Sequence, residues 1–248
     1  MKPVTFKTAA FIPARLQSQR FPGKLLRDLG GKPVVVRTWE NAVKTGLFDT
    51  VWVITDSPEI AEAVRQAGGE VKISRRAHAS GTDRIAEYAG ETEADIIINI
   101  QADEPFVSRP ALGQILEAFA TDTKREIDIV SLMQPIENEK DFYDPNRVKV
   151  VTDLNGYAMY FSRAPIPYPR DGKWHGAFGH IGIYAFRRDV LEQIARLPET
   201  ELEKIEKLEN LRFLQAGFRI KMLLTGETFM GIDTPEDLEK ARKMLGHE

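Results

Sequence analysis

Short apolar runs and amphipathic stretches alternate along the first half of the chain. Residues 9–12, 50–55 and 95–100 are largely apolar or β-branched, which is typical of parallel strands covered on both faces of a sheet. Residues 70–73 form a shorter run of the same kind. Because amphipathic segments separate these runs, the alternation of strand and helix predicts an α/β fold with a doubly wound, mostly parallel sheet.

Two of the intervening helices carry clear terminal signals. We expect the first over residues 32–45, because Pro33 stands near its start and Gly46 just after its end. Ser57 is the predicted N-cap of the next helix, which a Gly-Gly pair at 68–69 closes. The first helix would bury one face, made of Val35, Val36, Trp39, Ala42 and Val43.

The pattern changes after a helix over 109–120 and a strand over 127–134. Residues 148–152 and 157–162 flank an Asn-Gly pair, a strong hairpin signal, so two antiparallel strands are predicted there. We expect one face of this hairpin to meet another subunit. Further elements follow: a Pro-rich aromatic loop at 164–178 (a mobile flap or a plain connector), a strand at 180–186, an amphipathic helix at 203–215, a strand at 220–224 and a last helix capped by Thr234.

Composition and charge limit the class of protein. The chain has 248 residues and a formal net charge of -3, so it lacks the basic footprint of a nucleic-acid-binding protein. It contains no cysteine, which excludes disulfides and thiolate metal sites and suits a reducing cytosol. No charged-then-apolar leader precedes the first strand, and no apolar run is long enough to span a bilayer. We expect a soluble, cytoplasmic protein without membrane insertion.

A basic loop follows the first predicted strand. The apolar run ends at Pro13, and Arg15, Arg20 and Lys24 follow within eleven residues, with Gly23 beside the lysine. Open α/β sheets bind ligands at the carboxyl ends of their strands, and cations there suit a polyphosphate. The loop has neither a Walker pattern nor a dinucleotide glycine fingerprint. Phosphate binding and an ordinary solvated loop therefore both stay open on spacing alone.

Two carboxylates come directly after apolar segments. Asp103 follows the predicted strand over 95–100, and Asp233 follows a short apolar segment near the end of the chain. Carboxylates at the rim of a sheet can hold Mg²⁺ together with phosphate oxygens and water. Each is also open to a simpler role in a turn or helix cap, because a proline stands two residues further on.

Three further polar strings are weaker signals. Residues 78–84, HASGTDR, place hydroxyl groups and a cation at a helix start, which suits recognition of a base, ribose or phosphate. His180 and Tyr184 are four residues apart and share one face of a predicted strand, but no second ligand nearby supports zinc. Residues 206, 209 and 210 lie near one face of the predicted helix over 203–215, where a solvated charged face is the default interpretation.

The order of these strings is more informative than any one of them. IPAR, RFPGK, SGTDR, NIQADEP, DPNRVKVV, GYAMYFSRAPIP, GHIGIYAFRR, IEKLENLR and GIDTPEDL follow one another over nearly the whole chain. This series closely resembles the bacterial 3-deoxy-manno-octulosonate (Kdo) cytidylyltransferases, also called CMP-Kdo synthetases, over roughly residues 8–245. The resemblance implies a Rossmann-like nucleotide-diphospho-sugar transferase fold, a homodimer, Mg²⁺ dependence and activation of Kdo by CTP for lipopolysaccharide or capsule synthesis.

The resemblance also implies an organisation of the chain. Residues 1–248 would form a single nucleotidyltransferase domain. Its nucleotide-binding half would cover roughly 8–134, its sugar-binding and dimerisation portion 135–228, and its C-terminal metal-site segment and helix 229–248.

Site residues follow from the resemblance position by position. Asp103 and Asp233 match the metal carboxylates, and together with Arg15 and Lys24 they form the implied catalytic set. The implied nucleotide-binding residues are Arg15, Arg20, Lys24, Ser80, Thr82, Arg84 and Gln101. The implied sugar-acid-binding residues are Gln101, Arg163, His180, Tyr184, Glu209 and Asn210. In the implied reaction the sugar 2-hydroxyl attacks the α-phosphorus of CTP, either beside Mg²⁺ or with a metal that only accompanies the pyrophosphate.

Three positions depart from the family pattern. Ala102 replaces a glycine, Gly179 replaces a lysine, and Asn210 stands where the family has glutamine. The last two fall in sugar-side segments, so a modified Kdo, such as an 8-amino form, or another sugar acid is an alternative substrate. A dehydrogenase is disfavoured by the missing glycine fingerprint, and a non-catalytic module on the same fold is a third alternative.

Overall fold

The computed structural model describes residues 6–18, 20–78, 80–227 and 229–246. The chain divides into two compact units. Unit 1 comprises Met1–Gly113 and Glu227–Glu248, and unit 2 comprises Gln114–Gly226. This division differs from the portions implied by the resemblance, because the first boundary falls within helix α4 (Arg109–Thr121) rather than near residue 134.

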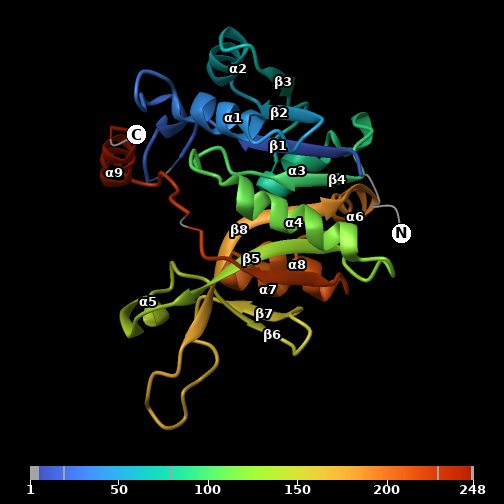
Figure 1. Ribbon diagram of the computed structural model, residues 1–248, viewed down its shortest axis with the longest axis vertical. Coiled ribbons are helices and arrows are strands. Elements are labelled where there is room, and N and C mark those ends of the chain that lie inside the picture. The colour runs from blue at the N-terminus through green and yellow to red at the C-terminus, as the bar shows by residue number, and fades with distance from the viewer. Residues whose placement is uncertain (1–5, 19, 79, 228, 247–248) are drawn as a thin grey trace. The chain divides into compact units, whose positions relative to one another are not determined.

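Unit 1 contains a parallel sheet with the strand order β3-β2-β1-β4 (Figure 1). Its strands are β1 (Thr8–Ala14), β2 (Thr50–Thr55), β3 (Glu70–Ile73) and β4 (Ile96–Asn99). All residues of β1 and β4 are buried, as their apolar sequences predict for strands covered on both faces. The helices of unit 1 are η1 (Lys24–Leu26), α1 (Val34–Lys44), α2 (Pro58–Gln66), α3 (Gly81–Ala86), η2 (Ala89–Glu91) and α9 (Pro235–Leu245).

The predicted end of the first strand at Pro13 is wrong, because β1 continues to Ala14. Beyond Phe11, β1 pairs in register only with β2, since the β4 register stops at Asn99. A proline has no N–H to donate, but a residue with a single neighbouring strand does not need to donate on its open side. The strand therefore tolerates Pro13 where its second partner has ended.

The helix signals of unit 1 are largely confirmed. Ser57 accepts a hydrogen bond from the Ile60 N–H at the start of α2, and Thr234 and Asp237 form a capping box at the start of α9. The predicted inner face of α1 is wrong at one position, because Val43 is 47% exposed while Thr38 is fully buried. Thr38 is accommodated because its hydroxyl donates to backbone carbonyls, including that of Ala102 at 2.9 Å.

Unit 2 is built around antiparallel pairing. Strand β8 (Ala177–Arg187) pairs antiparallel with β5 (Ile129–Ile136) on one side and with β6 (Lys149–Thr152) on the other. The predicted hairpin is confirmed, because β6 pairs antiparallel with β7 (Ala158–Ser162). Strand β9 (Ile220–Leu224) pairs parallel with β5. The helices of unit 2 are α5 (Glu139–Tyr143), α6 (Arg188–Ile194), α7 (Glu201–Glu206) and α8 (Asn210–Gln215). Of these, α5 and α6 were not predicted.

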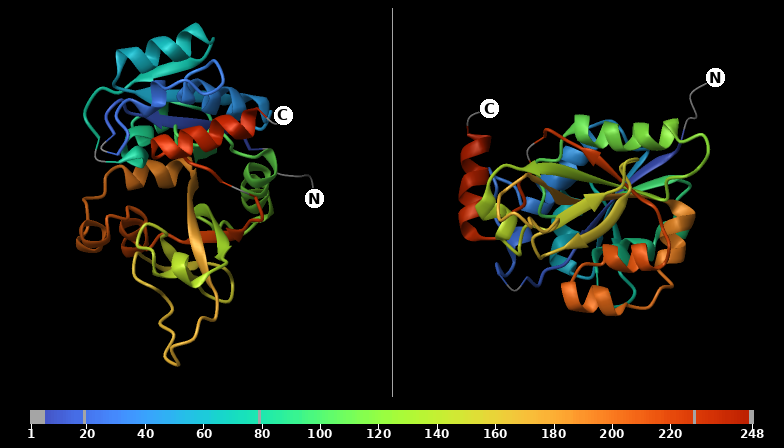
Figure 2. Two further views of the ribbon diagram at one scale, coloured as in Figure 1. Left: turned by 90° about the vertical axis from the view of Figure 1, so that its left-hand side faces the viewer. Right: turned by 90° about the horizontal axis from the view of Figure 1, so that it is seen from below.

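Two predictions in unit 2 need correction. The expected helix over 203–215 is two helices, since Lys207 adopts a left-handed conformation with φ of 54° and ends α7. The strand expected from residue 180 begins at Ala177 and shortens the preceding loop, which extends away from the strands (Figure 1, Figure 2). Trp174 ties this loop to α5, with its ring centroid 4.8 Å from that of Phe142. Among the described residues, no helix is both long and apolar enough to cross a membrane.

Candidate active site

The strand order of unit 1 marks where a ligand can bind. The chain winds from β1 outward to β2 and β3, then returns to place β4 on the other side of β1. The connections therefore reverse direction between β1 and β4, and the carboxyl ends of these neighbouring strands form a topological switch point. The basic loop leaves β1 here, and the segment with Gln101 and Asp103 leaves β4 here.

Lys24 lies between the two predicted metal carboxylates. Its Nζ is 2.5 Å from Asp103 Oδ2 and 2.9 Å from Asp233 Oδ1, and only 11% of its side chain is exposed. Burial alone lowers the pKa of Lys24, but the charges and hydrogen bonds of both carboxylates outweigh it and raise the pKa overall. The C-terminal segment is held in place by a hydrogen bond from the Ile232 N–H to the Asp103 carbonyl at 2.9 Å.

The other two cations of the loop are more exposed. Arg20 Nη2 lies 3.0 Å from Asp233 Oδ2, with 65% of the Arg20 side chain exposed. Arg15 follows directly after β1 and is also exposed. Gly23 takes a left-handed conformation with φ of 68° at the start of η1, where a side chain would be strained. The loop thus combines one buried and two accessible cations at the switch point.

Glu104 is a candidate that the sequence reasoning missed. Burial raises the pKa of its carboxyl to about 7, and the negative charges of Asp103 and Asp233 add to the shift. Its position directly after Asp103 in an acidic pair was the available signal. A cation bound beside the three carboxyl groups would lower this pKa, so Glu104 would gain negative charge when a cation is present.

The two aspartates fit a divalent metal in one respect. They lie close enough together to share one ammonium group, and Mg²⁺ needs only one or two protein carboxylates when phosphate oxygens and water complete its coordination. Across the described ranges, no group of three or more His, Cys, Asp or Glu side chains forms a metal cage by itself. The arrangement is therefore suited to a metal that arrives with a phosphate ligand.

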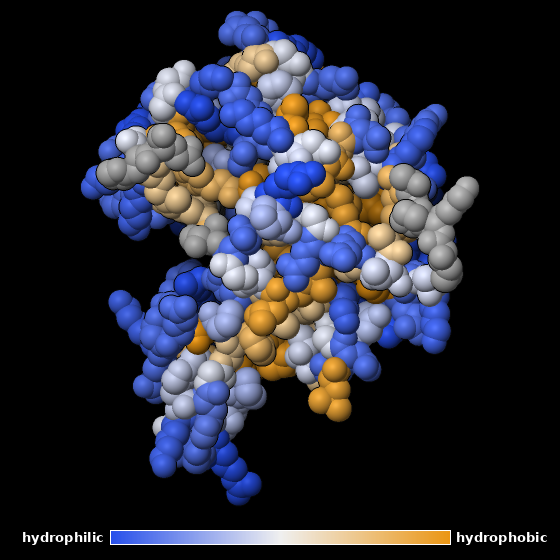
Figure 3. Space-filling view, viewed as in Figure 1, coloured by the Kyte–Doolittle hydropathy of each residue, from blue (hydrophilic) through white to orange (hydrophobic). Residues whose placement is uncertain are grey.

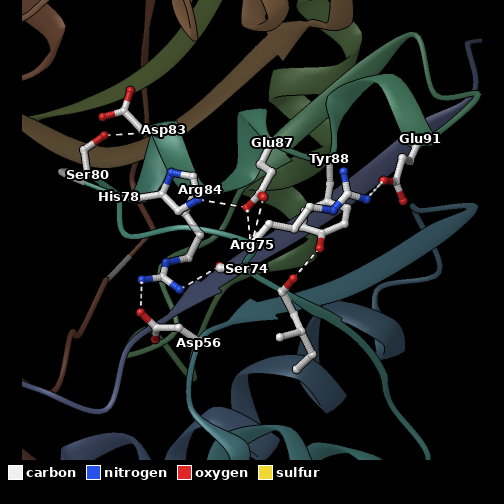
Figure 4. Close-up of polar contacts among 11 residues, drawn as sticks. Asp56, Ser74, Arg75, His78, Ser80, Asp83, Arg84, Glu87, Tyr88 and Glu91 are labelled. Carbon is white, nitrogen blue, oxygen red and sulfur yellow. Dashed lines mark hydrogen bonds and ion pairs between the residues drawn. The ribbon is translucent and has the colours of Figure 1, made fainter.

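The HASGTDR segment forms the start of α3 and is tied to its surroundings. The Ser80 hydroxyl accepts a hydrogen bond from the Asp83 N–H at 3.1 Å and caps the helix, while Thr82 is fully buried. Arg84 is also buried, and its guanidinium donates to Asp56 Oδ2 at 2.9 Å and to Ser74 Oγ at 2.8 Å (Figure 4). The hydrogen bond from Arg84 to Asp56 lowers the pKa of the Asp56 carboxyl.

A second contact in the same region anchors the start of that segment. His78 Nε2 lies 2.8 Å from Glu87 Oε2 with both side chains buried, and Glu87 also accepts from the Arg75 N–H (Figure 4). Arg84 and His78 thus bond to protein partners, whereas Gly81, the first residue of α3, lies next to the end of β1.

Gly81 explains how that approach is possible. A Cβ at this position would lie 3.2 Å from Pro13 Cγ and 3.8 Å from Gln101 Oε1. The start of α3 therefore packs directly on the end of β1, and the Gln101 side chain lies beside it. Lys24, Asp103, Asp233, Gln101 and the Ser80 turn all belong to unit 1, and the strand ends gather them around one switch point.

His180 and Tyr184 lie together in unit 2 on β8. Their ring centroids are 5.2 Å apart, which confirms the predicted shared face. Burial lowers the pKa of His180 to about 3, so its imidazole is neutral. Ser131 Oγ donates to the Ile183 carbonyl at 2.9 Å, so its lone pair accepts from His180 Nε2 at 3.0 Å. This network assigns the proton to Nε2 and leaves Nδ1 as an acceptor.

The start of α8 brings Glu209 and Asn210 to the same cluster. Burial raises the pKa of the Tyr184 hydroxyl far above its usual range, the charge of Glu209 adds to this, and a hydrogen bond with Asn210 partly opposes it. Asn210 is 1% exposed, and its Oδ1 has no hydrogen-bond partner among the described residues. The helix break at Lys207 separates these two residues from Glu206, so the predicted common helical face of the three is wrong.

Arg163, the last predicted sugar-side residue, follows β7. Its Nε donates to the Glu206 carbonyl at 2.7 Å and its Nη1 to the Pro145 carbonyl at 2.9 Å. Its N–H donates to the Glu206 carboxylate at 2.9 Å. These hydrogen bonds thus hold Arg163 against the end of α7. Nothing in the sequence pattern pointed to Glu206 as its partner, because the helix break was not predicted.

Comparison with known proteins gives these clusters a chemical context. The family model described as Cytidylyltransferase matches residues 9–222. The chain belongs to the cytidylyltransferase family. The resemblance noted from the motif order is confirmed by relatives named 3-deoxy-manno-octulosonate cytidylyltransferase. One from Flavobacterium johnsoniae is 51% identical over 96% of this chain and 98% of its own, and one from Christiangramia forsetii is 47% identical over 98% and 99%.

Solved cytidylyltransferase structures confirm the α/β fold. A CMP:2-keto-3-deoxy-manno-octonic acid synthetase, solved in complex with CTP, has a TM-score of 0.90 at 39% identity and covers 97% of this chain and 99% of its own. The 4-diphosphocytidyl-2C-methyl-D-erythritol synthase of Anaerococcus prevotii has a TM-score of 0.66 at 13% identity, covering 97% and 99%, and supports the fold alone.

Proposed function

We propose that this cytidylyltransferase activates Kdo with CTP, giving CMP-Kdo and pyrophosphate for lipopolysaccharide or capsule synthesis. The observation that carries the proposal is the near-full-length identity of about one residue in two to enzymes of that name. The CTP complex of the structural relative supports CTP as the nucleotide. The switch point of unit 1 supplies the cations and carboxylates that such a reaction needs.

The proposed reaction is an in-line displacement. The 2-hydroxyl oxygen of the sugar acid forms a bond to the α-phosphorus of CTP, the bond from that phosphorus to the bridging β-phosphate oxygen breaks, and the hydroxyl proton is released. Catalysis of this kind depends mostly on positioning and on neutralising charge. Arg15, Arg20 and Lys24 are the proposed triphosphate ligands and would offset the charge on the departing pyrophosphate.

We further propose Mg²⁺ as the metal, held by Asp103 and Asp233. A bound Mg²⁺ would lower the pKa of the sugar hydroxyl and neutralise phosphate charge. Lys24 currently balances both aspartates, so binding of the triphosphate gives its ammonium an alternative anionic partner. The aspartates are then available to the metal that accompanies the nucleotide. Glu104 lies beside them, and a bound cation would lower its raised pKa and favour its charged form.

The proposed nucleotide and sugar contacts differ in kind. On the nucleotide side, the proposed contacts are Ser80, Thr82 and Gln101. We propose that Arg84 helps to hold this segment in place through its bonds to Asp56 and Ser74. On the sugar side we propose a set of contacts to the carboxylate and hydroxyls of the sugar acid: Gln101, Arg163, His180, Tyr184, Glu209 and Asn210. The neutral His180 would accept from a sugar hydroxyl through Nδ1.

A modified Kdo is the second candidate substrate. Asn210 Oδ1 is a buried acceptor without a partner among the described residues, and an unsatisfied buried acceptor favours a ligand that donates. A sugar acid with an amino group in place of a hydroxyl would donate more strongly than Kdo. Any such preference would show as a higher kcat/KM for the amino sugar.

We also propose a homodimer, as the resemblance implies. Unit 2 exposes large apolar side chains on its hairpin and on the loop before β8: Leu154, Met159 and Tyr168. On the face drawn in Figure 3, hydrophilic residues cover most of the remaining loop surface. Light scattering of the purified chain tests this proposal, and a monomer at micromolar concentration contradicts it. The cytoplasmic location stays a prediction.

The decisive experiment for the activity is pyrophosphate release. The chain is incubated with Mg²⁺, CTP and, in turn, Kdo, 8-amino-Kdo, a sialic acid or no acceptor. We expect release with CTP and Kdo and little with ATP. Release without any sugar acid, or equal turnover of ATP, contradicts the proposed function.

A further inference from the structure

Lys149 is buried in unit 2 and is not among the proposed substrate contacts. It lies on β6 between two strands, in register with Ser162 of β7 and Gly179 of β8, and its exposed fraction is 0%. Its Nζ donates to two backbone carbonyls, that of Asp144 at 2.9 Å and that of Arg163 at 2.6 Å.

This environment is costly for an ammonium group. A buried charge is normally balanced by an opposite charge, and no carboxylate lies within 4.0 Å of Lys149 Nζ among the described residues. Burial lowers the pKa of Lys149, while the more distant charges of Asp144 and Glu206 partly oppose the shift. An apolar side chain would avoid this cost but would leave both carbonyls without their donor, so the ammonium serves to hold these two backbone segments together.

The two carbonyls connect Lys149 to the segments that carry the sugar-side residues. Arg163 accepts from Lys149 and itself donates to the Glu206 carbonyl and carboxylate at the end of α7. Three residues later, Glu209 and Asn210 begin α8. The turn at Asp144 and Pro145 is held from both sides, by Lys149 and by Arg163 Nη1.

On its β8 side, Lys149 lies next to the segment that carries His180. Gly179 stands beside Lys149 in the β6–β8 register, and the His180 N–H donates to the Val148 carbonyl at 2.8 Å. One buried lysine thus lies at the junction of the three segments that carry Arg163, His180 and Glu209.

We propose that Lys149 is a positioning residue for sugar-acid binding, which fixes the Arg163 backbone and adds a buried positive charge near the residues proposed to contact an anionic sugar. This inference rests on the proposed function, since it concerns the sugar side of the same site. It predicts that loss of the ammonium weakens binding of the sugar acid and leaves binding of CTP unchanged, because the nucleotide contacts belong to unit 1.

The first test is Lys149→Met, which keeps the length of the side chain and removes its donors. We expect the KM for Kdo to rise about tenfold, the effect of one charge-assisted hydrogen bond, with an unchanged KM for CTP. Arg187→Met is the matched control. It removes another buried cation of unit 2, paired with Asp122 at the far end of β8, and should lower the melting temperature without changing the KM for Kdo. A folded Lys149→Met chain with the wild-type KM for Kdo overturns the inference.

A chemical test separates charge from packing. The chain contains no cysteine, so Lys149→Cys can be unfolded, alkylated at that single thiol with bromoethylamine to give a thioether analogue of lysine, and refolded. We expect this adduct to restore the KM for Kdo, and a neutral propyl adduct not to restore it. Equal KM values for the two adducts overturn the inference. A neutral adduct that fails to refold also counts against it, because the ammonium then supports the whole unit.

The wild-type chain, assayed in parallel, keeps the two hypotheses apart. No pyrophosphate release from CTP and Kdo by wild type overturns the proposed function. Normal wild-type release combined with an unchanged KM for Kdo in Lys149→Met overturns only the role of Lys149.

Discussion

Lys24 in unit 1 and Lys149 in unit 2 are both buried, but their partners differ in kind. Lys24 is shared by two carboxylates, which together raise its pKa, whereas Lys149 has two carbonyl partners and a lowered pKa. Two carboxylates carry charge that can bind another cation in place of the ammonium, whereas the two neutral carbonyls of Lys149 carry no net charge to favour such an exchange. The comparison indicates an exchangeable charge at the proposed nucleotide end and a fixed charge at the proposed sugar end.

We expect the largest loss of activity when either carboxylate that shares Lys24, Asp103 or Asp233, is neutralised. We expect Asp103→Asn and Asp233→Asn each to lower kcat by about 10²–10³-fold or more while the chain still folds. Each substitution removes a proposed metal ligand and the negative charge that would attract the metal. Steady-state kinetics at saturating Mg²⁺ and circular dichroism measure the two effects. Asp189→Asn, an exposed aspartate paired with Arg125, is the control. Wild-type kcat in either variant would exclude that residue as a ligand.

Removing the cation of the same cluster should produce two effects of opposite sign. In Lys24→Met the affinity for CTP should fall about 10- to 100-fold, because a charge-assisted hydrogen bond to phosphate is lost. Mn²⁺ without nucleotide should bind more tightly than to wild type, because the two aspartates lose their resident counter-charge. Titration calorimetry with CTP and with Mn²⁺ measures both. If the affinities for both ligands fall, Lys24 and the metal do not compete for the carboxylates.

At the proposed sugar end, a substitution with a smaller expected effect on kcat/KM tests Asn210, whose Oδ1 has no hydrogen-bond partner among the described residues. Glutamine carries the same amide on a longer stem, so Asn210→Gln tests whether the pocket is shaped around the shorter side chain. We expect kcat/KM for Kdo to be unchanged or a few-fold lower, because Asn210 is buried and an extra methylene must displace its neighbours. A clear gain with Kdo, accompanied by a loss with 8-amino-Kdo, would instead assign the modified sugar as the substrate.

The smallest effect concerns stability at alkaline pH. The folded chain holds the proton on Lys149 less tightly than the unfolded chain, whose lysine keeps a pKa near 10.5. Between the lowered folded pKa and 10.5 the unfolded state binds more protons, so the free energy of unfolding attributable to Lys149 rises with pH across that window. Urea denaturation of wild type and Lys149→Met should therefore show a difference that shifts in favour of wild type as the pH approaches 10.5. A difference independent of pH contradicts the lowered pKa.

The sequence predicted unit 1 more completely than unit 2. The strands of unit 1 are continuous apolar runs, and Ser57 and Thr234 occupy conventional cap positions, so local patterns sufficed. In unit 2 a lysine rather than a glycine ends α7, and no propensity rule anticipates a left-handed Lys207.

The site shows the same contrast. Motif order identified Asp103 and Asp233, but their common partner Lys24 depends on contacts between residues 79 and 209 positions apart. In the sequence Lys149 resembles an ordinary surface lysine of a strand, and only the tertiary structure shows that it is buried and donates to the carbonyls of Asp144 and Arg163. Glu104 was visible as the neighbour of Asp103, yet its raised pKa depends on burial, which the sequence does not specify.

The contact of Gly81 with Pro13 has a practical consequence for redesign. A side chain at position 81 would place its Cβ 3.2 Å from the ring of Pro13, which is itself part of a buried strand, so a substitution there requires one of the two segments to shift. Glycine at position 81 therefore permits the close spacing between α3 and β1. Redesign of the proposed nucleotide site should therefore leave residues 13 and 81 unchanged and begin with Gln101, whose side chain lies beside residue 81.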